Sequence, residues 1–263
     1  MKSAARDIVS RVISNERIAD RIHDIRFALH SAAEPPLPGQ FAHVSVPGVF
    51  LRRPISIAGF DPASRIARLI VRVAGRGTDI LSHMKTGDET RMTMPLGNPY
   101  PIRELTGGEI PDIWLVGGGI GAAPLLYAAD YISRLAGGRA GIKTFLGFRD
   151  AAAAFGASEF EAYGETSLDI GGFVTDALTE SLGKKIPDAI LACGPAPMLS
   201  SLQKICARSG VRAYASLEER MGCGVGACLV CNCGISKDAG DEVSYKRVCR
   251  DGPVFPLPEV VFK

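Results

Sequence analysis

The chain has 263 residues, of which 46% are hydrophobic and 22% are charged, and its formal net charge is +2. This composition is typical of a globular protein and excludes intrinsic disorder. The near balance of charges, without a long basic run, argues against a protein that binds nucleic acid through phosphate contacts. The length suggests two domains, with room for a small third region.

No segment of the sequence has the pattern of a membrane span or of a signal peptide. One long uncharged run, residues 113–129, contains several glycines and a proline. It is shorter than the roughly 20 residues that a spanning helix needs. The first thirty residues carry scattered charges and lack the apolar core of a signal peptide. We therefore expect a cytoplasmic protein whose seven cysteines stay reduced.

The first hundred residues predict an antiparallel β-barrel. Six short β-like segments are separated by turn signals, and they span residues 8–13, 25–29, 41–46, 51–58, 66–73 and 90–94. One helical turn, residues 78–84, interrupts the series. Six short strands with such connections favour a barrel.

Two places in this barrel have the chemistry of an anion site. One strand carries Arg53, Pro54, Ile55 and Ser56. A proline within a strand marks an edge or a bulge where the backbone can face a ligand, and arginine beside serine supplies a cation and a hydroxyl for a phosphate. Gly77 and Thr78, at an expected helix start, add N–H donors and a capping hydroxyl. The alternative is a basic strand that simply faces solvent.

From residue 107 onward, strands alternate with helices. The expected strands span residues 113–116, 143–148, 189–192 and 211–215, and the expected helices span residues 121–135, 173–182 and 195–208. Such βαβ units predict a parallel sheet.

Two turns of this sheet are candidate ligand sites. The first contains Gly118, Gly119 and Gly121, and a turn of this kind lets a pyrophosphate approach a helix N-terminus. No acidic residue follows at the usual interval of about twenty, so tight strand–helix packing is the alternative. The second turn contains Cys193 and Gly194. Ligands bind beyond the carboxyl ends of parallel strands, so both turns are expected at one crevice, where Cys193 either touches a ligand or is simply buried.

The cysteines near the end of the chain predict an iron–sulfur site. Cys223, Cys228 and Cys231, followed by Cys249, match the plant-type [2Fe–2S] spacing C-x4-C-x2-C…C. The small residues between them allow backbone N–H groups to approach anionic sulfurs. A structural zinc site, the alternative, would prefer paired C-x2-C units or histidines, and all four histidines lie in the first third of the chain. Cys233 is either an alternative ligand or a small buried residue.

These motifs together resemble one family. The run Arg-Pro-Ile-Ser at residues 53–56 resembles the flavin signature of the ferredoxin reductase superfamily, and the two glycine-containing turns resemble its nicotinamide domain, in the same order. Residues 216–228 and 245–255 closely resemble the electron-transfer subunit of B-type dihydroorotate dehydrogenase. The resemblance implies three regions: an FAD-binding β-barrel domain at 1–106, an NAD-binding α/β domain at 107–215, and a [2Fe–2S] cluster-binding region at 216–263.

The resemblance also implies cofactors, partners and site residues. Members of that family bind FAD and a [2Fe–2S] cluster and pass electrons between NAD and an FMN-containing catalytic subunit in pyrimidine biosynthesis, as a heterotetramer with two copies of each chain. By resemblance the iron ligands are Cys223, Cys228, Cys231 and Cys249. The FAD site would then contain Arg53, Pro54, Ile55, Ser56, Ile70, Val71, Arg72, Gly77 and Thr78, and the NAD site Gly118, Gly119, Gly121, Cys193 and Gly194.

Two departures from the family pattern stand out. Ile55 occupies the tyrosine or leucine position of the flavin signature, so this side chain offers no aromatic stacking. Residues 237–241 lengthen the hairpin between the third and fourth cysteine ligands. The resemblance places dihydroorotate chemistry on the partner, so no catalytic residue for that step is expected here. The alternatives are an NAD(P)H-dependent flavin/iron–sulfur reductase that serves another acceptor, and a zinc-stabilised nucleotide-sensing regulatory protein.

Overall fold

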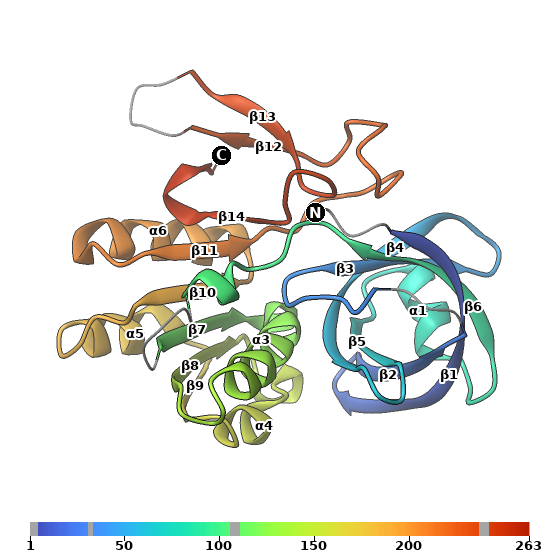
Figure 1. Ribbon diagram of the computed structural model, residues 1–263, viewed down its shortest axis with the longest axis horizontal. Helices are drawn as coiled ribbons and strands as arrows, with labels where there is room; N and C mark the ends of the chain where they lie inside the picture. Colours follow the sequence, from blue (N-terminus) through green and yellow to red (C-terminus); the bar gives the residue numbers. More distant parts are fainter. Residues whose placement is uncertain (1–4, 31–33, 106–110, 237–241, 263) are drawn as a thin grey trace.

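The computed structural model describes residues 5–30, 34–105, 111–236 and 242–262. A β-barrel, an α/β sheet and a small C-terminal sheet follow one another along the chain (Figure 1). The expected fold class, a barrel followed by a parallel-strand domain and a small cysteine-containing region, is confirmed.

The barrel closes in the strand order β1-β2-β5-β4-β3-β6. Its strands are β1 (Arg6–Ala19), β2 (Ile22–Leu29), β3 (Phe41–Val46), β4 (Val49–Asp61), β5 (Ile66–Arg72) and β6 (Glu89–Leu96), with α1 (Arg76–Ser82) between β5 and β6. Alternate side chains on a strand face opposite sides, and Phe27, Ile57 and Leu69 fill the barrel interior. Each of the six expected segments lies within one of these strands or overlaps it.

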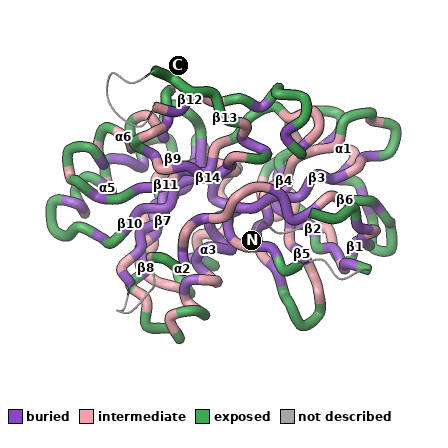
Figure 2. Tube along the Cα trace, turned by 45° about the horizontal axis from the view of Figure 1, so that its top comes forward, coloured by how far each residue is buried: buried purple, intermediate pink, exposed green. Residues whose placement is uncertain are grey.

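The second unit is a six-stranded sheet with the order β14-β11-β10-β7-β8-β9. Its parallel strands are β7 (Asp112–Gly118), β8 (Gly141–Phe148), β9 (Glu165–Ile170), β10 (Ala189–Cys193) and β11 (Ala213–Ser216). Ile113 and Leu115 of β7 pack on one face, and Trp114 and Val116 pack on the other. Figure 2 shows that the central strands of this sheet are almost wholly buried.

Helices cover both faces of this sheet. The helices are α2 (Ile102–Leu105), α3 (Ala122–Leu135), α4 (Ala157–Glu161), α5 (Val174–Leu182) and α6 (Ala196–Ser209). Core residues of α3 share a cluster with one face of β7, and those of α5 and α6 share a cluster with the other face. In the part of the chain that the structure describes, no helix is long and apolar enough to cross a membrane.

The C-terminal region packs against both other units. A three-stranded sheet with the order β13-β12-β15 contains β12 (Asn232–Ile235), β13 (Ser244–Arg247) and β15 (Val260–Val261). β14 (Val254–Pro256) instead leaves this sheet and pairs antiparallel with β11. Phe41 of the barrel shares a hydrophobic cluster with Cys231 and Cys249. The lengthened hairpin expected at 237–241 lies outside the described residues.

Specific contacts join the barrel to the α/β unit. The hydroxyl of Tyr127 on α3 donates to the carbonyl oxygen of Pro36 at 2.7 Å. Arg68 on β5 bridges Asp24 of the barrel, at 2.9 Å, and Glu159 of α4, at 2.6 Å. The Arg68 and Asp24 side chains are 17% and 10% exposed, so little water screens this ion pair. These contacts hold the barrel and the α/β unit together, and the cavity described below lies between the two units.

Candidate functional site

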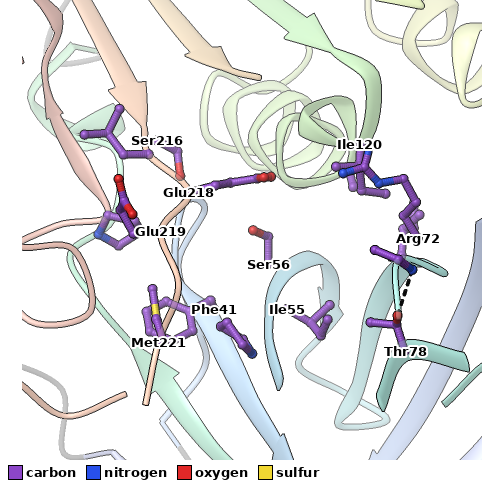
Figure 3. A pocket seen from close by; sticks show the side chains of 16 residues that line it. Phe41, Ile55, Ser56, Arg72, Thr78, Ile120, Ser216, Glu218, Glu219 and Met221 are labelled. Atoms are coloured by element: carbon purple, nitrogen blue, oxygen red, sulfur yellow. Dashed lines mark hydrogen bonds between the residues drawn. The ribbon is translucent and has the colours of Figure 1, made fainter. Parts of the chain in front are cut away.

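A cavity of about 220 Å³ lies where the barrel, the start of α3 and the end of β11 meet (Figure 3). The lining residues from the predicted flavin site are Pro54, Ile55, Ser56, Ile70, Arg72 and Thr78. Val71 does not line it, because its side chain points into the barrel core and leaves only its main chain for a ligand. The structure thus brings three separate barrel segments to one cavity.

Arg53 lies beside this cavity, across the start of α1. Its Nη1 donates to the carbonyl oxygens of Leu51 at 2.6 Å and Arg52 at 3.3 Å. A Cβ built on Gly77 would lie 2.3 Å from the Arg53 Nε, so the guanidinium rests on the main chain of Gly77. The first N–H groups of a helix have no intrahelical partner. A cation beside such N–H groups fits an anionic group such as a phosphate.

Thr78 shapes the loop that precedes α1. Its Oγ1 accepts a hydrogen bond from the N–H of Ala74 at 2.9 Å and donates to the carbonyl oxygen of Gly75 at 3.0 Å. The predicted capping hydroxyl is therefore used within the chain, where it fixes the loop that forms one wall of the cavity.

We expect Gly77→Ala to weaken FAD binding at least severalfold. The new methyl group would occupy the position of the Arg53 guanidinium and displace it. Gly75→Ala is the matched control, because nothing lies within 4 Å of a Cβ at that position and its φ of 176° is extended backbone. FAD affinity measured for both purified variants tests this. Equal affinity in the two variants would contradict the placement of Arg53 at the FAD.

The two glycine-containing turns of the α/β sheet lie against each other. A Cβ on Gly121 would lie 2.3 Å from the carbonyl oxygen of Cys193, and one on Gly194 would lie 3.0 Å from the N of Gly118. Close packing accounts for the lack of a side chain at Gly121 and Gly194, and for the first turn this was the alternative given above. Gly119 differs, since its φ is +53° and nothing lies within 4 Å of its Cβ position. It is the point of this turn where a ligand has room to approach the backbone.

Sequence reasoning missed Glu218, which points into the cavity (Figure 3). Glu218 keeps an exposed surface toward the open cavity, but the protein atoms around it desolvate its carboxyl group and raise its pKa, and the positive charge of Arg72 opposes that rise. Ser216 also lines the cavity, and Cys193 is buried nearby, where burial raises the pKa of its thiol. Both Ser216 and Glu218 stand at the carboxyl end of β11. The rule that ligands bind beyond the carboxyl ends of parallel strands would have pointed to them.

The cysteine loop directs backbone N–H groups at sulfur atoms. Cys223 Sγ accepts from the N–H groups of Ala227 at 3.2 Å and Cys228 at 3.5 Å, and Cys231 Sγ accepts from the N–H of Cys249 at 3.4 Å. Burial raises the pKa of Cys223, but hydrogen bonds to its sulfur outweigh burial and lower the pKa to about 6. A sulfur that is readily ionised and already hydrogen-bonded fits an iron–sulfur cluster.

The four predicted ligands are arranged as two pairs. Cys223 interacts with Cys228, and Cys231 interacts with Cys249, whose pKa burial raises to about 12. Across the described ranges, no group of three or more metal-ligating side chains is close enough to hold a metal ion. Cys228 is exposed, whereas Cys231 and Cys249 are buried. Donor type, order and hydrogen bonding fit a [2Fe–2S] cluster, which these four cysteines would hold.

The C-terminal region and the fold of the whole chain both match known proteins. Residues 218–261 match the family described as the iron–sulfur cluster binding domain of dihydroorotate dehydrogenase B, which favours iron over zinc at the cysteines. Among solved structures, the NADH-dependent reduced ferredoxin–NADP oxidoreductase superposes with a TM-score of 0.80 and 29% identity, over 100% of this chain and 92% of that one. Phthalate dioxygenase reductase superposes with a TM-score of 0.62 and 20% identity, over 93% and 77%, and shows the fold alone.

Curated relatives match over nearly the whole chain. The dihydroorotate dehydrogenase B (NAD(+)) electron transfer subunit of Caldanaerobacter subterraneus subsp. tengcongensis is 40% identical over 261 residues, which cover 96% of this chain and 98% of that protein. The subunit of the same name from Geobacillus thermodenitrificans is 39% identical over 260 residues, with 95% and 96% covered. The barrel, the cavity and the cysteine loop thus occur in a chain that belongs to the family of electron-transfer subunits of dihydroorotate dehydrogenase B.

Proposed function

We propose that this chain carries electrons between NAD and a dihydroorotate-oxidising catalytic subunit in pyrimidine biosynthesis, through FAD and a [2Fe–2S] cluster. One observation carries the proposal: Phe41 lines the cavity and also packs with Cys231 and Cys249 in one hydrophobic cluster. The predicted flavin site and two of the predicted iron ligands therefore border the same hydrophobic cluster.

The barrel residues would hold the FAD. Arg53 and the first N–H groups of α1 would bind its phosphates, and Ser56, Ile70 and Arg72 would contact the part that enters the cavity. FAD, when bound, exchanges a hydride with nicotinamide and single electrons with an iron–sulfur cluster. The protein supplies orientation and excludes water, since Phe41 and Ile70 are both nearly fully buried.

The crevice beside the two glycine-containing turns would hold NAD. Ile120 and Ala123, which follow Gly119, line the same cavity as Ser56. A dinucleotide on Gly119 would therefore reach the flavin from the α/β side. We assign Gly118, Gly121 and Gly194 an indirect role, because they allow the close packing that shapes this crevice.

The partner would dock on the cysteine loop. Cys228 is exposed, and so are the apolar side chains of Val225, Leu229 and Val230 around it, at 52%, 59% and 56%. Exposed apolar groups in one patch mark an interaction site. We propose that an FMN-containing subunit covers this loop, with two copies of each chain in the assembly. The cytoplasm is the expected compartment, because cysteines stay reduced there.

The division of labour between the two subunits tests this proposal. The purified chain with its cofactors is expected to oxidise NADH with an artificial electron acceptor and to show no dihydroorotate oxidation. Removing a proton from a carbon acid needs a positioned base, and we assign that base to the partner. Adding the catalytic subunit should couple dihydroorotate oxidation to NAD reduction. Dihydroorotate turnover by this chain alone would overturn the assignment of roles.

A second candidate function is an NAD(P)H-dependent reductase that serves a different acceptor protein. The superposition on the reduced ferredoxin–NADP oxidoreductase over 100% of this chain supports it, since one architecture serves another acceptor there. Dye reduction by NADH together with failure to couple to any dihydroorotate-oxidising subunit would favour this second candidate.

A further inference from the structure

His43 is a buried imidazole between the barrel and the cysteine loop. It lies on β3, where Ala42 and Val44 point into the barrel core, so His43 points outward on the same side as Phe41. The residue is nevertheless only 3% exposed, because the C-terminal region covers this side of the barrel. It pairs across the strands with Pro54 of the predicted flavin motif.

The imidazole rests on the main chain of the cysteine loop. A Cβ built on Gly224 would lie 2.7 Å from the Nδ1 of His43 and 3.2 Å from its Cε1. Gly224 also has a φ of +70°, which L side chains rarely adopt. A side chain at this position would therefore strain the backbone and collide with the ring. Gly224 directly follows Cys223, so the ring lies one residue from a predicted iron ligand.

One nitrogen of this ring is left without a partner. Nε2 is fully buried and makes no hydrogen bond to any residue that the structure describes. Burying an unpaired polar nitrogen is unfavourable, so such an atom points to a ligand that completes it. Burial lowers the pKa of His43, the charge of Arg52 lowers it further, a hydrogen bond with the main chain of Arg52 opposes this, and the charge of Arg53 adds to the lowering. An imidazole carries at least one N–H in either protonation state, so the ring can donate a hydrogen bond.

We propose that the Nε2–H of His43 donates a hydrogen bond to a sulfur of the [2Fe–2S] cluster held by the Cys223 loop, and thereby raises the reduction potential of that cluster. The inference rests on the proposed cluster site. Hydrogen bonds to cluster and ligand sulfurs tune the potential. A donor stabilises the reduced cluster more than the oxidised one, because the reduced cluster carries one more negative charge.

The first test uses the wild-type protein with its cluster. The protein is labelled with ¹⁵N in histidine only, the cluster is reduced, and hyperfine coupling is measured by pulsed electron paramagnetic resonance. We expect a ¹⁵N coupling that disappears in labelled His43→Gln, which retains the other three histidines. A reduced cluster in the wild type without any ¹⁵N coupling would overturn the proposal. A protein without any cluster would instead contradict the proposed function, so the two failures are distinguishable.

The second test measures the potential. His43→Phe keeps a ring of similar size and removes the donor, so the equilibrium constant for reducing the cluster should fall roughly tenfold. For a one-electron couple this is about 59 mV. His43→Gln, which keeps an N–H donor, should recover part of the shift, and the potential of FAD should stay unchanged in both variants.

His30→Phe is the matched control, because His30 is an exposed histidine at the end of the barrel strand β2 and should leave the potential unchanged. A wild-type potential in His43→Phe with an intact cluster would contradict the proposal. If His43→Phe fails to assemble the cluster, the labelling of the wild type and the potential of His43→Gln still decide the outcome.

Discussion

Cys228→Ser is expected to abolish the visible absorbance of the iron–sulfur cluster while FAD stays bound. The substitution removes one of four predicted iron ligands, and the exposed position of Cys228 means that the change leaves the protein core intact. Among the described residues that line the flavin cavity there is no cysteine of the loop. Absorbance spectra, together with iron and FAD content of the purified variant, measure both effects.

Cys233→Ser is the matched control for this experiment. Cys233 lies on β12, packs against the hydrophobic cluster that contains Cys231, and has a pKa that burial raises to about 11. Cys233 falls outside the C-x4-C-x2-C…C spacing of the four predicted ligands, so the cluster should be retained without it. Loss of the cluster in Cys233→Ser, together with its retention in Cys249→Ser, would show that the assigned ligand set is wrong.

Arg53→Ala is expected to weaken FAD binding about tenfold or more. A hydrogen bond from a guanidinium to a phosphate contributes about 1.5–3 kcal/mol. The guanidinium of Arg53 donates to carbonyl oxygens of its own strand. Because these oxygens carry no formal charge, the positive charge of Arg53 remains available to bind an anion. The measurement is FAD occupancy after dialysis, followed by titration of the stripped protein with FAD.

Arg52→Ala removes the same charge from the neighbouring position and serves as the control. The Arg52 Nη1 lies 2.6 Å from a carboxylate oxygen of Asp7 and 2.7 Å from the hydroxyl of Thr93. Hydrogen bonds from Arg52 and Arg91 hold the pKa of Asp7 at about 2, so this arginine is already paired within the barrel. FAD affinity should be near that of the wild type. If FAD affinity fell equally in the two variants, Arg53 would act only through the overall positive charge of this strand and not through its own contact with FAD.

Local patterns in the sequence predicted those parts of the structure that local forces determine. The barrel strands follow from period-two alternation, and the cysteine spacing marks a loop whose ligands lie close together in the chain. The same alternation indicates that Val71 faces opposite to Ile70 and Arg72, so only its main chain is available to the predicted flavin site.

Parts of the fold that depend on distant segments were not predictable from these patterns. β9 was missed because it is an edge strand with Leu168 and Ile170 exposed, so it lacks the continuous apolar run of a buried strand. β14 has three residues and becomes a strand by pairing with β11. Phe41 was not predicted to line a site, because only the packing of the C-terminal region on the barrel brings it together with Leu217 and Met221 at the cavity.

Anaerobic titration with NADH tests the central claim most directly. In the chain with both cofactors, NADH should bleach the flavin absorbance and also reduce the cluster, which then gives an electron paramagnetic resonance signal. In Cys228→Ser, NADH should reduce the flavin alone, and in Arg53→Ala stripped of FAD it should leave the cluster oxidised. Reduction of the cluster by NADH without FAD, or flavin reduction that never reaches an intact cluster, would contradict electron transfer from NAD through FAD to the cysteine loop.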